Sequence, residues 1–202
     1  MSIILEHNFQ TKAHSLPRLF EGVNKMSQLM RKIEQESIID PLRYDPDKYK
    51  GDAFEFFVEL LLSLHPVDNR VGVYNYKPKQ ENDNGVDGTG INIKGDNSVV
   101  QIKYRSNTQT ELSSNKDSLS NLITDGMLSH NVVADMNNPK NFRHFVFTTA
   151  DGLNFYTDKE MFKSKVKCFG YKDFRSMLDN NTVFWNKVRE IVDIIETKAL
   201  PL

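Results

Sequence analysis

The spacing of apolar residues changes near residue 70 of this chain, and this change restricts the fold more than any other feature of the sequence. Before it, apolar residues recur at steps of three and four, which predicts a helix from about 45 to 65. The stripe consists of Phe54, Phe57, Val58, Leu61 and Leu62. From Val71 onward the runs VGVYNY, GINIK and SVVQIKYR are typical of strands, with a turn at 95–97. A helix followed by a three-stranded meander predicts a sheet covered by helices.

The rest of the chain continues to alternate between helices and strands. We expect helices at 119–130, 158–162, 173–178 and 182–199, and strands at 144–150 and 166–171. A polar loop is expected from Ser106 to Ser118. The order αβββαβαβαα predicts an α/β fold with a mixed central sheet flanked by helices.

One amphipathic helix of about 20 residues is predicted ahead of this core, over 16–33. Its apolar stripe consists of Leu16, Leu19, Val23, Met26, Met30 and Ile33. Such a stripe packs on the body of the protein or pairs with a second chain across a two-fold axis. A homodimer is therefore one expectation.

Composition excludes several classes of protein. The chain has 202 residues, a net charge of −1 and one cysteine, Cys168, so neither an intramolecular disulfide nor a cysteine zinc site can form. No run approaches the roughly 18 apolar residues that a membrane span requires. The sequence also lacks GxxxxGK[ST], and its five histidines lack metal-site spacing. We expect a cytoplasmic protein with no signal peptide, no membrane partner and no nucleotide cofactor.

Polar side chains interrupt the strand SVVQIKYR on one of its faces. Gln101 and Lys103 lie two residues apart and share a face, while the apolar neighbours point to the other. Asp87 lies upstream in NDNGVDGTG, and hairpin geometry brings it near Gln101. If the preceding helix packs over this sheet, Glu55 joins them. Oxygen ligands of this kind suit Mg²⁺ or Mn²⁺.

Three motifs together resemble the PD-(D/E)XK nuclease superfamily, in its Mrr-like and resolvase-like branch. They are GDAFEFFVELL from Gly51, NGVDG from Asn84 and VQIKYR from Val100, and the resemblance covers roughly residues 49 to 150. It implies a restriction-endonuclease-like αβββαβ core in a nuclease domain at 45–202, with 1–44 as an N-terminal helical extension.

The resemblance also assigns roles to four residues. It implies that Glu55, Asp87, Gln101 and Lys103 are catalytic and that the first three hold Mg²⁺, with Mn²⁺ as a substitute. The implied activity is phosphodiester hydrolysis in DNA by a divalent-metal-dependent endonuclease of a restriction, homing, repair or junction-resolving type. Lys103 stabilises charge on the phosphate, orients the nucleophile or acts as a base. The alternative is a catalytically silent nuclease-like fold that serves as a DNA-binding or assembly subunit.

Other residues compete for these roles. Glu59 is the second carboxylate on the helix of Glu55, Lys94 is a rival lysine, and Asp83 is a second aspartate near Asp87. We rank each below its neighbour, with Glu59 as a supporting residue and Asp83 as a turn residue.

Basic residues gather after the predicted active strand and again between 159 and 175, where aromatic residues lie among them. Such clusters are either solvated faces or phosphate contacts. The candidate contacts to DNA are Arg105, Lys116, Lys163, Lys165 and Lys167.

Overall fold

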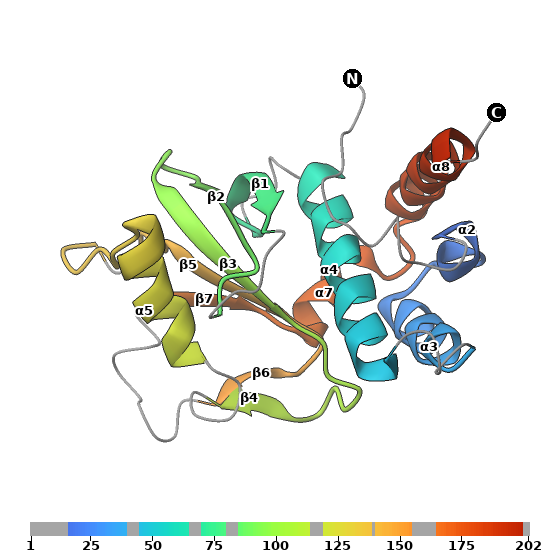
Figure 1. Cartoon of the computed structure of the whole chain (residues 1–202), viewed down its shortest axis with the longest axis horizontal. Coiled ribbons are helices and arrows are strands. Elements are labelled where there is room, and N and C mark those ends of the chain that lie inside the picture. Colours follow the sequence, from blue (N-terminus) through green and yellow to red (C-terminus); the bar gives the residue numbers. More distant parts are fainter. Residues whose placement is uncertain are drawn as a thin grey trace.

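The computed structural model describes residues 16–39, 45–64, 70–79, 85–113, 119–138, 140–154 and 165–199. Its centre is a five-stranded sheet in the order β1-β2-β3-β5-β7, with helices on both faces (Figure 1). The described part of the chain therefore confirms the predicted α/β class with a mixed sheet. No helix within these ranges is long and apolar enough to cross a membrane.

The sheet consists of an antiparallel three-stranded meander followed by two strands that are parallel to its last strand. Strands β1 (Val73–Pro78), β2 (Gly88–Asn92) and β3 (Asn97–Lys103) are antiparallel neighbours. Strands β5 (His144–Thr148) and β7 (Val166–Phe169) then run parallel to β3. The carboxyl ends of β3, β5 and β7 therefore share one edge of the sheet.

Helix α5 (Leu119–His130) covers one face of the sheet, and α4 (Pro46–Leu64) covers the other (Figure 1). Alternation along β3 assigns its side chains to these faces, because Val99 belongs to the core under α5 and Val100 to the core under α4. Helices α7 (Tyr171–Leu178) and α8 (Thr182–Ala199) add to the layer on the α4 side. Both C-terminal helices and α5 agree with the sequence prediction, whereas the helix expected at 158–162 lies outside the described residues.

The single N-terminal helix expected at 16–33 is wrong. The chain forms α2 (Leu16–Phe20) and α3 (Met26–Ser37), separated by a turn in which Gly22 has φ +69°. Glycine adopts this left-handed conformation without the penalty that other residues incur. The turn keeps the apolar residues on one side of the chain, so their spacing in the sequence is the same as in one continuous helix.

The apolar stripe of this region is not available for pairing with a second chain. Val23, Met26 and Ile33 have no exposed surface, and they share one core with α4 and α8. The expectation that the stripe packs on the body of the protein is confirmed for its described side chains, and its use as a dimer contact is corrected.

Aromatic side chains hold the α4 layer together. The Phe57 ring stacks on Trp185 of α8 at 5.9 Å and lies 6.0 Å from the ring of Phe174 on α7. Helix α4 is buried on nearly all sides, and even Glu59 is only 3% exposed. A helix this apolar lies between layers rather than at the surface.

Two short strands were not anticipated. Strands β4 (Glu111–Ser113) and β6 (Gly152–Asn154) form a parallel pair beside the main sheet. Leu112 and Leu153 anchor this pair in the core under α5. The polar loop predicted at 106–118 therefore includes strand β4 at 111–113.

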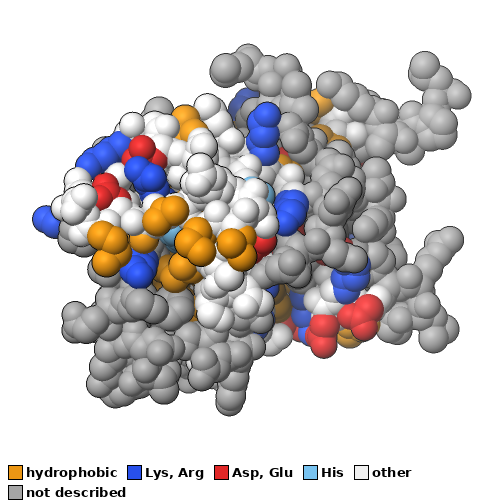
Figure 2. Space-filling model, turned by 60° about the vertical axis from the view of Figure 1, so that its left-hand side comes forward, with side chains coloured by type: hydrophobic (Ala, Val, Ile, Leu, Met, Phe, Trp, Pro, Cys, Tyr) orange, Lys and Arg blue, Asp and Glu red, His pale blue; other side chains and the backbone are white. Residues whose placement is uncertain are grey.

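Helix α5 has apolar side chains on its outer side as well. Figure 2 shows hydrophobic side chains gathered on the face that carries this helix. The large exposed ones on α5 and the segment after it are Met127, Leu128, Val133 and Met136. This face is therefore mixed in character rather than uniformly basic.

Candidate functional site

The predicted site lies at the first residue of β2, where the paired strand β3 extends past the end of β2. Gly88 pairs with Val100, so Asp87 stands opposite Gln101 at the open end of the ladder. The Asp87 backbone N–H donates to Val100 O at 2.9 Å, and its carboxylate accepts the backbone N–H of Ile102. Asp87 is 8% exposed. Its carboxylate thus takes the place of the missing β2 partner and is fixed against the strand of Gln101 and Lys103.

Gln101 is wholly buried, and neither its amide oxygen nor its amide nitrogen has a hydrogen-bond partner. A buried polar group without a partner costs roughly 1–3 kcal/mol, so native proteins rarely leave one unsatisfied. The amide sits on the α5 face of β3, next to the position of Asp87. The Gln101 amide is therefore the buried polar group without a partner that lies nearest to Asp87 at the open end of the β2–β3 ladder.

Lys103 follows on the same face and is half-buried. Its backbone is held by Thr148, which pairs with it across the parallel ladder and donates its hydroxyl to Lys103 O at 2.8 Å. Thr149 continues this contact by accepting the Arg105 N–H at 2.6 Å. Sequence reasoning missed these two threonines, because paired threonines at a strand end give no distinctive signal.

Glu55 lies on the other side of the sheet from Gln101 and Lys103. It is half-buried on α4, and the neighbouring Phe54 ring contacts Tyr104 at 6.0 Å. Tyr104 comes directly after β3, so Glu55 is level with the same end of the strand as Lys103. The structure therefore places Gln101 and Lys103 on one face of β3, with Asp87 opposite Gln101, and leaves Glu55 on the far face.

The rival residues separate in space. Lys94 is exposed in the turn that joins β2 to β3, at the opposite end of the hairpin from Asp87. Glu59 is one helical turn beyond Glu55 and is buried. Asp83 lies outside the described residues. The placement of Lys94 favours Lys103 as the lysine of the site.

The three candidate DNA contacts that the structure describes do not form one surface. Arg105 follows the site strand, and its guanidinium donates to Tyr104 O at 2.6 Å. Lys165 precedes β7 at the amino edge of the parallel strands, and Lys167 pairs with Phe145 on the α4 face. Lys116 and Lys163 lie outside the described residues. Of the described candidates, Arg105 alone adjoins Lys103.

A network from the N-terminal helices also reaches the end of the site strand. Glu34 on α3 accepts hydrogen bonds from the hydroxyls of Tyr104, at 2.8 Å, and Ser106, at 2.5 Å. Lys50 on α4 pairs with the other oxygen of Glu34 at 3.2 Å. The N-terminal helices therefore help to fix the segment that follows Lys103. The sequence gives no signal for contacts so distant along the chain.

The donor set suits a hard cation only in part. Among the described residues, no three His, Cys, Asp or Glu side chains are grouped as ligands. Asp87 and the unsatisfied Gln101 oxygen supply two oxygen donors. Mg²⁺ is commonly held by one or two carboxylates and retains several waters. Two protein donors are therefore compatible with it.

His144 fixes how closely α5 approaches this face of the sheet. A Cβ at Gly126 of α5 would lie 3.1 Å from His144 Nε2 and 3.0 Å from Val99 Cγ2, so only glycine fits there without displacement. His144 has no exposed surface. Burial, together with a smaller effect of the positive charge of Lys165, lowers the pKa of His144 to about 4. The imidazole is therefore neutral in the folded protein.

We expect this histidine to make folding stability depend on pH. The unfolded chain binds the proton near pH 6.5, whereas folded His144 binds it only near 4. Stability is therefore complete above pH 6.5 and falls by about 3 kcal/mol between pH 6.5 and 4. Urea unfolding of wild type and His144→Gln across this range measures the effect. Equal pH slopes in the two proteins would contradict it.

Comparison of the chain with protein-family models, with curated protein sequences and with solved structures found no match.

Proposed function

We propose that the protein is a Mg²⁺-dependent DNA endonuclease whose site is built from Asp87, Gln101 and Lys103. The observation that carries this proposal is the buried, unsatisfied Gln101 amide beside the Asp87 carboxylate. The order of the three sequence motifs supports it, since GDAFEFFVELL lies in α4, NGVDG leads into β2 and VQIKYR begins in β3. The restriction-endonuclease-like core is part of the same proposal.

Each residue has a distinct task in this reaction. Asp87 and the carbonyl oxygen of Gln101 hold the cation, and the Gln101 N–H₂ remains as a donor that orients a water. Mg²⁺, when bound there, supplies Lewis-acid stabilisation of charge on the phosphate. Lys103 places its ammonium on the same face and offsets the charge that grows on the phosphoryl oxygens. Arg105, two residues further along the chain, contacts a neighbouring phosphate.

A plasmid-nicking assay tests the proposal. Supercoiled DNA is incubated with the full chain and Mg²⁺, Mn²⁺ or a chelator, and relaxed and linear products are separated. We expect relaxed DNA with either metal and none with the chelator. The absence of metal-dependent cleavage on supercoiled, single-stranded and branched DNA would refute the proposal.

The role of the helix carboxylate gives a separate prediction. We expect Glu55→Gln to lower the cleavage rate more than Glu59→Gln does, because Glu55 is level with the carboxyl end of β3. Glu59→Gln should instead lower the free energy of unfolding, since Glu59 is almost fully buried. Single-turnover cleavage rates and urea unfolding of both variants provide the comparison. A slower Glu59→Gln enzyme would transfer the role to Glu59.

The structure also gives one observation in favour of the silent alternative. Gln101 has no exposed surface, and the sheet stands between it and Glu55. A DNA-binding or assembly subunit needs no open cation site. In that case the protein binds DNA equally well with and without Mg²⁺ and does not cleave it.

A further inference from the structure

Glu34 of α3 joins the N-terminal helices to the chain that follows β3. One of its carboxylate oxygens accepts the hydroxyls of Tyr104 and Ser106, at 2.8 Å and 2.5 Å. The other oxygen pairs with Lys50 Nζ of α4 at 3.2 Å. Partial burial raises the pKa of Glu34, but the two hydroxyl donors and the Lys50 ammonium outweigh it and hold this pKa below its ordinary value. Glu34 is therefore ionised at neutral pH and binds three donors at once.

The helix that carries Glu34 is fixed at its start by the C-terminal helices. Asp179, directly after α7, accepts the Met26 N–H at 2.8 Å, and the Arg189 guanidinium of α8 donates to Val23 O at 2.7 Å. The apolar side of α3 belongs to the core that it shares with α4 and α8. Glu34 is therefore carried by an anchored helix, so its carboxylate has a defined position relative to the sheet.

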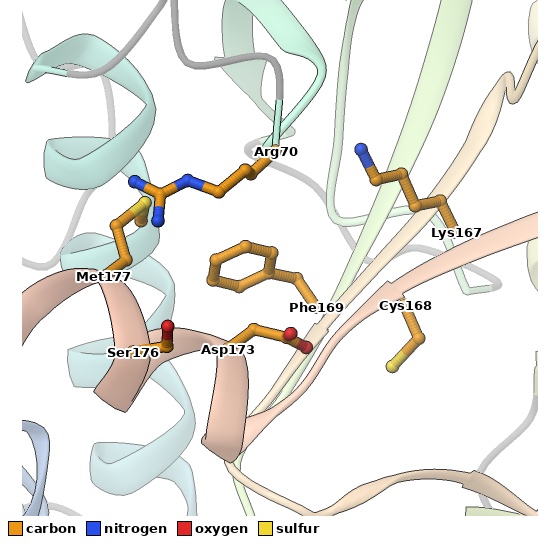
Figure 3. A pocket seen from close by; sticks show the side chains of 7 residues that line it. All are labelled: Arg70, Lys167, Cys168, Phe169, Asp173, Ser176 and Met177. Atoms are coloured by element: carbon orange, nitrogen blue, oxygen red, sulfur yellow. The ribbon is translucent and has the colours of Figure 1, made fainter.

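The ring of Tyr104 is fixed by aromatic packing under α4. It lies 6.0 Å from the ring of Phe54, which in turn lies 5.7 Å from the ring of Phe174. The Phe174 ring continues the series to Phe169 at 4.8 Å. Figure 3 shows Phe169 at the far end of this series, where its side chain extends from β7 toward α7 beside a hollow of about 150 Å³. Packing therefore fixes the ring of Tyr104, and Glu34 fixes its hydroxyl.

The position of Tyr104 sets the direction of its neighbour Lys103. Tyr104 belongs to the core under α4, and Lys103 points to the α5 face, because successive side chains of an extended chain alternate. A tyrosine that is fixed at both its ring and its hydroxyl therefore restricts rotation of the strand end about its own axis. Thr148 holds the Lys103 carbonyl from the β5 side. Glu34 supplies the corresponding contact from the α3 side.

We propose that Glu34 is a positioning residue of the cleavage site, which acts through Tyr104 on the direction of Lys103. This role rests on the proposed function, since Lys103 has a reacting phosphate to approach only if the protein cleaves DNA. A displacement of about 1 Å in a reacting group can lower a rate roughly 10²-fold. A carboxylate that touches neither substrate nor metal can therefore control the rate by fixing the end of the site strand.

Single-turnover cleavage by the full chain tests this role, with wild type measured first. We expect Glu34→Ala to lower the rate at saturating DNA at least about tenfold. The half-saturating DNA concentration should stay within about twofold of the wild-type value, because the lost contact acts on the reaction step rather than on binding. Arg105 keeps its own contacts to Thr149 in this variant. Glu34→Gln retains an oxygen that can accept the two hydroxyls, so it should recover most of the rate.

Glu36→Ala is the matched control, because this buried carboxylate of the same helix pairs with Arg18 at 3.0 Å. It should lower the free energy of unfolding and leave the cleavage rate unchanged. Tyr104→Phe keeps the ring and removes only the hydroxyl, so it should slow cleavage as Glu34→Ala does. The double variant should be no slower than the slower single variant, since the two side chains act as one unit. All rates are measured where urea unfolding shows each variant to be folded.

The outcomes separate the positioning role from the proposed function. Wild-type rates in Glu34→Ala or Tyr104→Phe, or an equal loss of rate in Glu36→Ala, would overturn the role of Glu34 and leave the proposed function in place. If Glu34→Ala does not fold, Tyr104→Phe alone decides. A wild type that does not cleave DNA would refute the proposed function, and the positioning role with it.

Discussion

Asp87→Asn is expected to abolish DNA cleavage and to leave the fold intact. Asparagine keeps a carbonyl oxygen that can accept the Ile102 N–H, so the end of the β2–β3 ladder stays closed. It loses the negative charge that holds the cation. A bound cation supplies several kcal/mol of transition-state stabilisation, and each 1.36 kcal/mol corresponds to tenfold in rate. We therefore expect single-turnover cleavage to fall by about 10³-fold or more.

Asp87→Ala is the matched variant, because it removes the charge and the hydrogen bond together. It leaves the Ile102 N–H without its partner, which costs roughly 1–3 kcal/mol of stability in addition to the activity. Urea unfolding should therefore rank wild type and Asp87→Asn close together and Asp87→Ala below both. Normal cleavage by Asp87→Asn would remove Asp87 from the site, whatever the unfolding curves show.

The elements of this fold were predictable because their signals are local. The helix that contains Phe54 and Phe57 and the strands around Val100 each bury a continuous apolar face, and periodicity reports such faces directly. The break between α2 and α3 was not predictable, since the turn at Gly22 preserves the apolar spacing. The pair β4–β6 was missed for the opposite reason, because three-residue strands have no measurable period.

The candidate site was predictable only along one strand and its hairpin partner. Alternation placed Gln101 and Lys103 on one face, and hairpin pairing placed Asp87 opposite Gln101. The local sequence pattern does not indicate which face of β3 is covered by α4. The apolar residues that alternate with Gln101 and Lys103 pack against α4, which puts Glu55 across the sheet from these two polar residues. The same sheet separates Lys167 from Lys103, although both are close to aromatic and basic residues in the sequence.

Lys103 carries the second large effect, and substitutions at this position separate the effect of charge from that of proton transfer. Lys103→Met keeps much of the apolar stem and removes the ammonium, so we expect turnover to fall by about 10²-fold or more while metal affinity is retained. The matched control is Lys94→Met, whose side chain is exposed at the far end of the hairpin and should not affect the rate.

Lys103→Arg then separates the possible roles of the ammonium. An arginine guanidinium stays protonated, so it can replace the charge of Lys103 but cannot accept a proton at neutral pH. Substantial activity in Lys103→Arg, together with an inactive Lys103→Met, assigns Lys103 to charge stabilisation. Loss of activity in both variants points to proton transfer or to the compact shape of the ammonium, and the pH–rate profile of wild type separates these two. Normal cleavage by Lys103→Met with a slow Lys94→Met would place the reaction at the other end of the hairpin, away from Gln101.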